Sequence, residues 1–396
     1  MLPKILIFLL LSHLSSFLQA SSQINRFQRE YKTLSKNNGD HNVYIWNVTN
    51  GKLKYSLQGH TSNVMSLAAL DHGLLASGST DSTIKIWSLS TGKLKYNLTD
   101  CDTSLGYFLL VKLEKNLLAS ASDNGITIWN ISNGTKMFSL FKNKVLVIDM
   151  VKLGEKLLVA STLDSNGYRT SIWNVFTGEF IKDIDSNEMN YLLVPLNDNQ
   201  LLASVGTLNG KDIFIKVWNT SSNTLKYRFK NASPYSLTQV GQSLLANQYI
   251  SSDGTQIGPV NVWDLNTGTL AFNLSCESTL VLEICEIQGA DLIQTKSLDN
   301  TTRIWSLKTG ELIYTLNELT YSDRTQIILY PPMIQSLLSL GNNLTASGSI
   351  SNIRIWDVTT GKLKLTLQQD TTDLWSLVKL NDGLLASANG FFLIYF

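Results

Sequence analysis

The stretch VMSLAALDHGLLASGSTDSTIKIWSLSTGKLKYNL, from Val64 to Leu98, contains four short runs in which Leu, Ile and Val alternate with Ser, Lys or Ala. This alternation is typical of β-strands that have one half-buried face. The runs are separated by Asp-His-Gly, Thr-Asp-Ser and Ser-Thr-Gly, whose residues tolerate tight or left-handed backbone. The stretch therefore predicts a compact unit of four short strands.

Tryptophan recurs along the chain as the second member of an Ile-Trp or Val-Trp pair, at intervals of 41, 42, 44, 45, 45, 42 and 51 residues. The recurring residues are Trp46, Trp87, Trp129, Trp173, Trp218, Trp263, Trp305 and Trp356. A period in the low forties that contains several strand signals is typical of propeller blades. A single four-stranded unit cannot bury both of its faces and must stack against neighbouring units.

The clearest unit resembles a WD40 repeat through Gly-His at 59–60, LLASGSTD at 74–81 and IKIW at 84–87. The resemblance extends from about residue 40 to the C-terminus. It implies that four strands, a to d, run outward from the axis of a propeller in each blade. It also implies a hydrogen-bonded tetrad of side chains, formed here by His60, Ser77, Asp81 and Trp87.

The other units depart from this pattern. No other unit has a His in the Gly-His position, and only Asp264 and Asp357 follow their tryptophan directly. Thr295, Asp299 and Trp305 keep three of the four tetrad positions. Losing both partners of a buried hydrogen bond can be nearly neutral. We therefore expect the remaining blades to be held mainly by packing, with fewer side-chain networks.

The chain begins and ends in the middle of a unit. Its first d run is 52–57 and its last a run is 373–380, so the closing blade must combine strands from both termini. The c strand of this blade has two candidates, 42–48 with Trp46 and the C-terminal FFLIYF, and we favour the first. A closed ring leaves no exposed apolar end. The prediction is an all-β, eight-bladed WD40-type β-propeller over residues 40–396.

The first twenty residues have the three-part form of a secretory signal peptide, with Lys4, an apolar ILIFLLL run and a plausible cleavage site after Ala20. The apolar run is too short to span a bilayer. Residues 21–39 are then an N-terminal extension. Nine Asn-X-Ser/Thr sequons are compatible with a secreted glycoprotein, whereas the WD40 resemblance favours the alternative, a cytoplasmic location.

The residues offer little for catalysis or metal binding. Only four His and three Cys occur, and the sequence contains no HExxH, CxxC, GxSxG or P-loop motif. We expect no enzyme activity, no cofactor and no metal. The formal net charge of +1 argues against a nucleic-acid partner, because such binding depends on a basic surface.

Lysines gather in the predicted outer strands, mostly in the phrase GKLK. They are Lys52, Lys54, Lys93, Lys95, Lys226, Lys362 and Lys364. One interpretation is a basic arc that attracts an anionic partner. The other, which the sequence favours, is that lysines on the exposed edge of each blade discourage strand addition by another molecule.

The connections between predicted strands differ in length in a systematic way. The c–d turns are short and similar, whereas insertions occur at 164–169, 208–211, 250–259 and 318–332. All four lie in b–c or d–a connections, which emerge on one face when strands alternate in direction. On this top face we expect a partner-binding site rich in aromatic and Arg side chains. Its predicted residues are Tyr168, Arg169, Lys211, Tyr249, Tyr321, Arg324 and Tyr330.

These observations favour a non-enzymatic scaffold that binds protein or peptide partners through its loop-enriched top face. One alternative is a secreted, lectin-like propeller that stacks aromatic side chains on carbohydrate. A propeller enzyme has the least support, because candidate acid–base and metal-ligand groups are so few. The sequence does not specify the partner or the oligomeric state.

Overall fold

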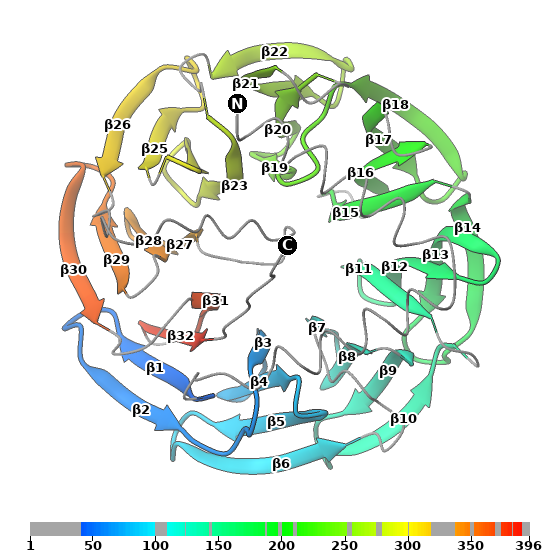
Figure 1. The fold of residues 1–396 in the computed structure, drawn as a ribbon, viewed down its shortest axis with the longest axis vertical. Helices are drawn as coiled ribbons and strands as arrows, with labels where there is room; N and C mark the ends of the chain where they lie inside the picture. The colour runs from blue at the N-terminus through cyan, green and yellow to red at the C-terminus, as the bar shows by residue number, and fades with distance from the viewer. Residues whose placement is uncertain are drawn as a thin grey trace, which may run out of the picture.

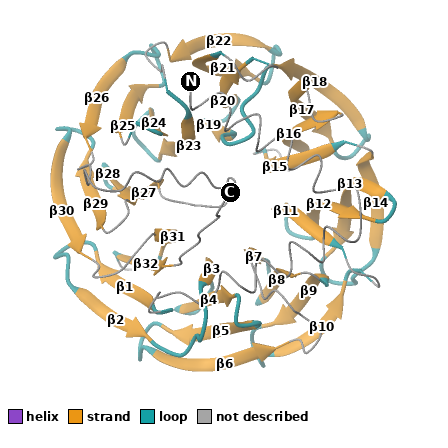
Figure 2. Cartoon of the chain, viewed as in Figure 1, coloured by secondary structure: helices purple, strands orange, loops and turns teal. Residues whose placement is uncertain are grey.

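A computed structural model describes residues 41–99, 109–122, 124–141, 145–186, 188–196, 200–208, 212–251, 256–274, 279–299, 301–317, 337–348, 352–368, 374–381 and 383–389. Within these ranges the regular structure is entirely β, arranged as eight four-stranded antiparallel sheets. The sheets form the blades of a closed ring (Figures 1 and 2). The predicted all-β, eight-bladed propeller is thereby confirmed.

Each blade has two inner strands, of which the first lies nearest the central axis and the second pairs with it (Figure 1). The innermost, or a, strands are β3 (Val64–Ala69), β7 (Leu109–Lys112), β11 (Leu146–Leu153), β15 (Met189–Pro195), β19 (Thr238–Val240), β23 (Val281–Ile287), β27 (Leu337–Gly341) and β31 (Leu374–Lys379). The b strands are β4 (Leu74–Ser79), β8 (Leu117–Ser122), β12 (Leu157–Asp164), β16 (Leu201–Leu208), β20 (Leu244–Ile250), β24 (Leu292–Ser297), β28 (Leu344–Gly348) and β32 (Leu384–Asn389).

The two outer strands complete each blade. The c strands, which carry the tryptophans, are β5 (Thr83–Ser88), β9 (Gly125–Asn130), β13 (Gly167–Asn174), β17 (Asp212–Asn219), β21 (Ile257–Asp264), β25 (Thr301–Ser306), β29 (Asn352–Asp357) and β1 (Val43–Asn47). The d strands are β6 (Lys93–Thr99), β10 (Thr135–Ser139), β14 (Phe180–Ser186), β18 (Thr224–Lys230), β22 (Thr269–Leu274), β26 (Leu312–Asn317), β30 (Lys362–Gln368) and β2 (Leu53–Leu57).

Both ends of the chain build the closing blade. Its strand order is β2-β1-β32-β31, and β1 pairs with β32 through Val43 opposite Ala388 and Trp46 opposite Leu385. The favoured c strand therefore occupies the predicted place, while FFLIYF lies outside the described residues. Pairing of the two ends closes the stack, so that every blade has a neighbour on both sides.

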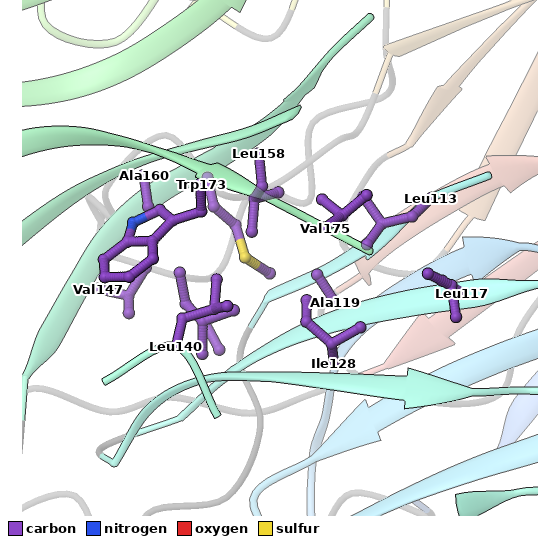
Figure 3. Close-up of a cluster of buried hydrophobic side chains, with 13 residues drawn as sticks. Leu113, Leu117, Ala119, Ile128, Leu140, Val147, Leu158, Ala160, Trp173 and Val175 are labelled. Atoms are coloured by element: carbon purple, nitrogen blue, oxygen red, sulfur yellow. The ribbon is translucent and has the colours of Figure 1, made fainter. Parts of the chain in front are cut away.

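The hydrophobic core lies between neighbouring blades, and the recurring tryptophan fills it from one side. Figure 3 shows the core in which Trp173 of β13 packs with Val147 and Ala160 of its own blade against Leu140 and Ile128 of the preceding one. The same arrangement places Trp87 against the closing blade. Tryptophan therefore recurs once per blade because each blade has one apolar junction with the preceding blade, where the indole ring buries a large area.

A second contact recurs at the outer rim of the ring. The Tyr55 ring of β2 lies over Gly92 in the c–d turn of the next blade, where a Cβ atom would lie only 2.5 Å from the ring. The Tyr55 hydroxyl donates a hydrogen bond of 2.9 Å to the Ser90 carbonyl. The further aromatic–glycine pairs are Tyr96 with Gly134, Phe138 with Gly178, Tyr227 with Gly268, Phe272 with Gly310, and Tyr314 with Gly361. Glycine is needed because the ring occupies the side-chain position.

Two junctions differ from this aromatic pattern. At ring closure Leu365 takes the place of the aromatic residue and lies against Gly51. Between β14 and the blade of β15–β18, Lys182 takes the aromatic position and donates to the Ser221 carbonyl at 3.2 Å, while Asn223 replaces the glycine with a φ of 59°. Asn tolerates this left-handed conformation better than most residues. At its rim the second junction therefore has a lysine hydrogen bond in place of the aromatic–glycine contact.

Candidate partner-binding face

Three of the predicted insertions join b strands to c strands, on the face of the ring that we call the top. The first insertion, at 164–169, is mostly strand and not loop. Strands β12 and β13 continue as a hairpin until Asp164 pairs with Gly167. Tyr168 and Arg169 consequently lie on β13 rather than in a loop. The lengthened strands carry these side chains on regular backbone, which positions them more rigidly than a loop would.

Tyr168 is half-buried, and burial raises the pKa of its hydroxyl. Two tyrosines of the following blades share this environment. Burial raises the pKa of Tyr191 strongly, and the charge that Tyr168 or Tyr235 would carry when ionised raises it further. This interaction indicates that the three hydroxyl groups lie in one neighbourhood. We call Tyr168, Tyr191 and Tyr235 the tyrosine surface.

Local backbone explains how the tyrosine surface reaches the top face. Tyr191 is the extra residue of a β-bulge in β15, because Asn190 pairs with Gly206 and Leu192 with Val205. Such bulges redirect a side chain relative to its strand. Tyr235 lies in the d–a connection between β18 and β19, where its amide donates to the Ser233 hydroxyl. The three residues therefore come from three consecutive blades.

The remaining predicted site residues are not brought together by the described structure. Arg169 lies 3.6 Å from Asp183 of the neighbouring strand, so that its guanidinium is partly engaged within its own blade. Tyr249 lies on β20 with its ring over Gly258 and its hydroxyl 3.4 Å from the Asn231 amide. Lys211, Tyr321, Arg324 and Tyr330 lie outside the described residues.

Beneath the tyrosine surface lies a set of charges, which we call the charged junction: the buried Asp185 and Lys216, and the partly exposed Glu188. The Lys216 side chain is 2 % exposed and forms ion pairs with both carboxylates, at 2.5 Å from Asp185. Asp185 belongs to β14 and Lys216 to β17, so the pair crosses from one blade to the next. A buried lysine requires such partners because desolvation of an unpaired charge is unfavourable.

Neutral side chains extend the charged junction towards the axis. The Asn190 amide donates to the Thr170 hydroxyl at 2.8 Å and to Asp185 at 3.2 Å. Ser161 donates to the Asn190 carbonyl. Nearer the axis, Asp149 of β11 accepts a 2.7 Å hydrogen bond from the Leu193 amide of the next blade. The junction therefore combines these polar contacts with an apolar cluster that joins Ile172 and Ile184 of one blade to Leu193 and Leu202 of the next.

Asp149, on the innermost strand β11, has a carboxyl group whose pKa is far above its ordinary value. Burial raises the pKa of its carboxyl group to about 7, although the hydrogen bonds from the Leu193 and Met150 amides act in the opposite direction. Desolvation disfavours the charged form of a carboxyl group, which is the physical cause of this direction. The carboxyl group thus titrates near neutral pH at the contact between two innermost strands.

The structure brings His60, Ser77, Asp81 and Trp87 into one chain of hydrogen bonds. The His60 ring lies 2.8 Å from Asp81 through Nδ1 and 2.7 Å from the Ser77 hydroxyl through Nε2, and Trp87 donates to the same hydroxyl at 2.8 Å. Burial alone would raise the pKa of Asp81, but the hydrogen bond and charge of His60 outweigh it and lower the pKa to about 2. The tetrad ties the d–a connection to strands b and c.

Half of this network persists where the full tetrad is absent. In five blades the tryptophan indole donates to a Ser or Thr hydroxyl on the adjacent b strand, at 2.7 to 3.0 Å. The pairs are Trp46–Ser387, Trp87–Ser77, Trp129–Ser120, Trp305–Thr295 and Trp356–Ser347. Side-chain networks therefore recur more widely than the sequence predicted. In three of these pairs, those of Trp46, Trp87 and Trp129, the serine ends the phrase Leu-Ala-Ser, whose leucine pairs with the tryptophan. The phrase alone is not a sufficient signal, because Ser204 ends the same phrase opposite Trp218 and its hydroxyl has no hydrogen-bond partner.

Trp173 shows what happens when this hydroxyl is missing. It pairs with Leu158 of β12, and the residue two positions further along is Ala160. The buried Trp173 indole nitrogen has no hydrogen-bond partner. This blade is also the one that carries Tyr168, and it contributes Asp149 and Asp185 to the polar junction with the following blade. The departures from the repeat thus cluster around one side of the ring.

Within the described ranges, no group of three or more His, Cys, Asp or Glu residues is placed to hold a metal ion. The same part of the chain includes no helix long and apolar enough to cross a membrane. Half-buried phenol groups offer rigid apolar area together with a hydrogen-bonding hydroxyl, which is a common composition of protein interfaces.

Comparison with known proteins agrees with this architecture. A family model described as WD domain, G-beta repeat, matches residues 51–88. The match covers β2 of the closing blade and β3, β4 and β5 of the blade with the full tetrad. Residues 51–88 therefore match a WD40 repeat, and the described residues form an eight-bladed β-propeller. The resemblance inferred from the sequence is confirmed.

Two further similarities extend over more of the chain. Autophagy-related protein 16 of Arabidopsis thaliana is 23% identical over 270 residues, which are 65% of this chain and 48% of the relative. The chain thus matches about half the length of that relative. The crystal structure of the computationally designed Ika8 protein superimposes with a TM-score of 0.64 and 20% identity, covering 84% of this chain and 95% of that one. This second similarity concerns the fold alone.

Proposed function

We propose that this propeller is a non-enzymatic scaffold that binds a protein or peptide partner on its top face, at the tyrosine surface. The observation that carries the proposal is the neighbourhood of Tyr168, Tyr191 and Tyr235, contributed by three consecutive blades. Tyrosine supplies a large contact area at little cost in side-chain entropy, and interface hot spots are rich in it. The similarity to a WD40 repeat and to autophagy-related protein 16 supports a scaffold role.

The polar junction beneath the tyrosine surface supports the same proposal. Native sequences depart from a regular packing pattern mainly where function requires it. Here an aromatic–glycine pair is replaced by Lys182 and Asn223, and a buried Lys216 joins two carboxylates. These groups fix the relative positions of two blades by directional contacts. We infer that they hold the tyrosines in a defined arrangement for a partner.

The test is partner capture by the full chain and by two matched variants. Tyr168→Ala with Tyr235→Ala alters the tyrosine surface, whereas Tyr227→Ala with Phe272→Ala removes two aromatic side chains from the outer wall. We expect the first variant to lose captured partners by about tenfold or more, as for central interface residues, and the second to retain them. Circular dichroism verifies folding of both. Equal retention by the two variants would refute the proposed site.

A glycan array distinguishes the lectin-like alternative. Carbohydrate binding that disappears in the Tyr168→Ala, Tyr235→Ala variant would replace the protein-binding proposal with that alternative. Absence of glycan binding together with retained protein capture supports the scaffold role.

We also propose that the chain enters the secretory pathway after loss of residues 1–20. The sequence of this segment supports the proposal, as do the exposed sequon residues Asn133 and Asn343, which lie in turns where a glycan would be solvated. N-terminal sequencing of protein made in secretory cells tests it. A mature chain that starts near Ser21 and carries N-glycans supports export; an intact, unglycosylated chain from the same cells contradicts it.

A further inference from the structure

A belt of exposed apolar side chains circles the outer wall of the ring. Every large hydrophobic side chain that is markedly exposed in the described residues lies on a d strand, with 39% to 51% of its surface accessible. The residues are Leu53, Leu94, Met137, Phe180, Ile181, Leu225, Leu270, Leu312, Ile313 and Leu363. Exposed apolar residues that are scattered need no explanation, but a continuous set of them indicates an interaction surface.

Along four consecutive blades the charged side chains of the outer strands themselves are all lysines, and Asp357 at the end of β29 lies beside Lys362 and Lys364. The outer strands β30, β2, β6 and β10 follow one another around the ring (Figure 1), and none of them contains Asp or Glu. The exposed lysines of this basic arc are Lys52, Lys54, Lys93, Lys95, Lys136, Lys362 and Lys364. Leu53, Leu94 and Leu363 each lie between two of them. The next strand, β14, ends the arc with Asp183 and Asp185.

Protection of the strand edge does not account for the basic arc. In all eight blades the c–d pairing contains a β-bulge beside the c-strand tryptophan. Opposite Trp87, for example, Leu94 and Tyr96 pair with β5 while Lys95 is left out of the ladder. A bulge already disfavours addition of another strand. The bulges at Ala271 and Ile313 have no lysine, so the lysines are not required for this protection.

We propose that the basic arc binds an extended acidic segment of a partner protein in which Asp or Glu alternates with apolar residues. Such a segment would place its carboxylates beside the lysines and its apolar side chains on Leu53, Leu94 and Leu363. Charge complementarity argues for this occupant. The arc runs around a convex wall, which a flexible chain can follow across several blades and a flat bilayer cannot. It lies at the c–d turn end of the blades, away from the tyrosine surface, and is independent of it.

Fluorescence anisotropy with a labelled peptide tests this proposal on the full chain. The probe is a peptide of about twelve alternating Glu and Leu residues, about 40 Å when extended. A peptide with Gln in place of Glu is the charge control. Lys52→Glu, Lys93→Glu and Lys362→Glu together alter the arc. Lys156→Glu, Lys226→Glu and Lys230→Glu, all exposed and outside it, provide the same change in net charge.

We expect the acidic peptide to bind the native chain and to lose affinity by about tenfold or more in the arc variant, since several modest ion pairs are reversed together. The matched triple variant should bind the acidic peptide nearly normally, which would show that the loss is not caused by net charge alone. The Gln peptide should bind the native chain poorly, because it lacks the carboxylates. Binding should weaken as salt is raised. Unchanged melting temperatures exclude misfolding.

Other occupants give different results. Equal loss in both triple variants, or no binding of the acidic peptide, would overturn the proposal. Binding of anionic phospholipid vesicles through the arc without peptide binding would replace it with a membrane contact. Concentration-dependent self-association that the arc variant abolishes, again without peptide binding, would assign the surface to a second copy of the chain.

Discussion

Two junctions between neighbouring blades pack with different side chains. The first joins the closing blade to the blade of β3–β6, and the second joins the blade of β11–β14 to that of β15–β18. At the first, Tyr55 covers Gly92 and Trp87 joins a hydrogen-bonded tetrad. At the second, Lys182 and Asn223 stand where the aromatic ring and glycine would be, and Lys216 is buried between two carboxylates. The first junction follows the repeat and the second departs from it.

The difference separates scaffold from candidate site. Apolar contacts between blades are non-directional and tolerate small shifts, whereas buried ion pairs and hydrogen bonds require a defined geometry. The charged junction, which is held by such directional contacts, is also the one beneath Tyr168 and Tyr191. We conclude that the regular junctions close the ring, while the charged junction determines how two neighbouring blades present the tyrosine surface.

Removing the buried cation should have the largest effect on stability. Lys216→Met removes the ion-pair partner of the buried Asp185, and we expect a loss of about 3–5 kcal/mol in the free energy of unfolding. The matched change Lys85→Met affects a lysine at the equivalent place that bonds to the neutral Asn97, and should cost about 1–2 kcal/mol. Urea unfolding measures both; equal small losses would show that the charged junction is not special.

Filling a glycine at the regular rim should have an intermediate effect. Gly92→Ala forces a Cβ atom into the Tyr55 ring and should cost about 2–4 kcal/mol from strain and overpacking. Gly73 has nearly the same φ, 66° against 68°, but no atom within 4 Å of an added Cβ. Gly73→Ala should therefore cost only about 1 kcal/mol. Tyr55→Leu should restore part of the loss in Gly92→Ala, because the closing junction already pairs Leu365 with Gly51.

The two junctions should respond to pH in opposite directions. Burial raises the pKa of Asp149 to about 7 from its ordinary 3.8, so the native state holds its proton where the unfolded chain has lost it. Stability then falls as the pH rises from about 4 to 7. The pKa of Asp81 is lowered to about 2, and its contribution is lost as the pH falls from about 4 to 2.

Asp149→Asn and Asp81→Asn isolate these effects in thermal unfolding across pH. The first variant should lose the decline between pH 4 and 7, and the second should lose part of the decline below pH 4. A profile for Asp149→Asn that parallels the native chain would show that this carboxyl group does not titrate at the blade contact.

The smallest expected effect is a gain. Ala160→Ser would place a hydroxyl group where five other blades have one, within reach of the unpartnered Trp173 indole. We expect stabilisation of about 0.5–1 kcal/mol, the usual net value of one hydrogen bond. Ser120→Ala in the preceding blade is the reciprocal change and should destabilise by a similar amount or more. A loss of stability in Ala160→Ser would show that this core has no room for the added atom.

The sequence was sufficient for the scaffold because each blade repeats the same short-range pattern. Trp at a fixed period, turn residues at fixed offsets and incomplete units at both ends together predicted eight blades and their closure. The phrase GKLKY at 92–96 also contained the rim contact, since Gly92 receives the Tyr55 ring and Tyr96 covers Gly134. Without coordinates, nothing in that phrase indicates which blade its tyrosine meets.

The candidate site was only partly predictable. Tyr168 stood out because an insertion preceded it, whereas Tyr191 lies inside an ordinary strand pattern and is redirected by a bulge that the sequence does not specify. Lys216 occupies the same place as Lys85 in its repeat, and its partners come from another blade. Such contacts depend on long-range register and are invisible to local periodicity.

Site-specific photo-crosslinking tests the central claim most directly. A benzoylphenylalanine residue replaces Tyr168 or Tyr235 in the full chain, and Tyr227 or Phe272 of the outer wall in matched controls. If the tyrosine surface is the partner site, the first two positions yield the same covalent protein adduct in cells and the controls do not. Adducts from the outer-wall positions alone would contradict the account.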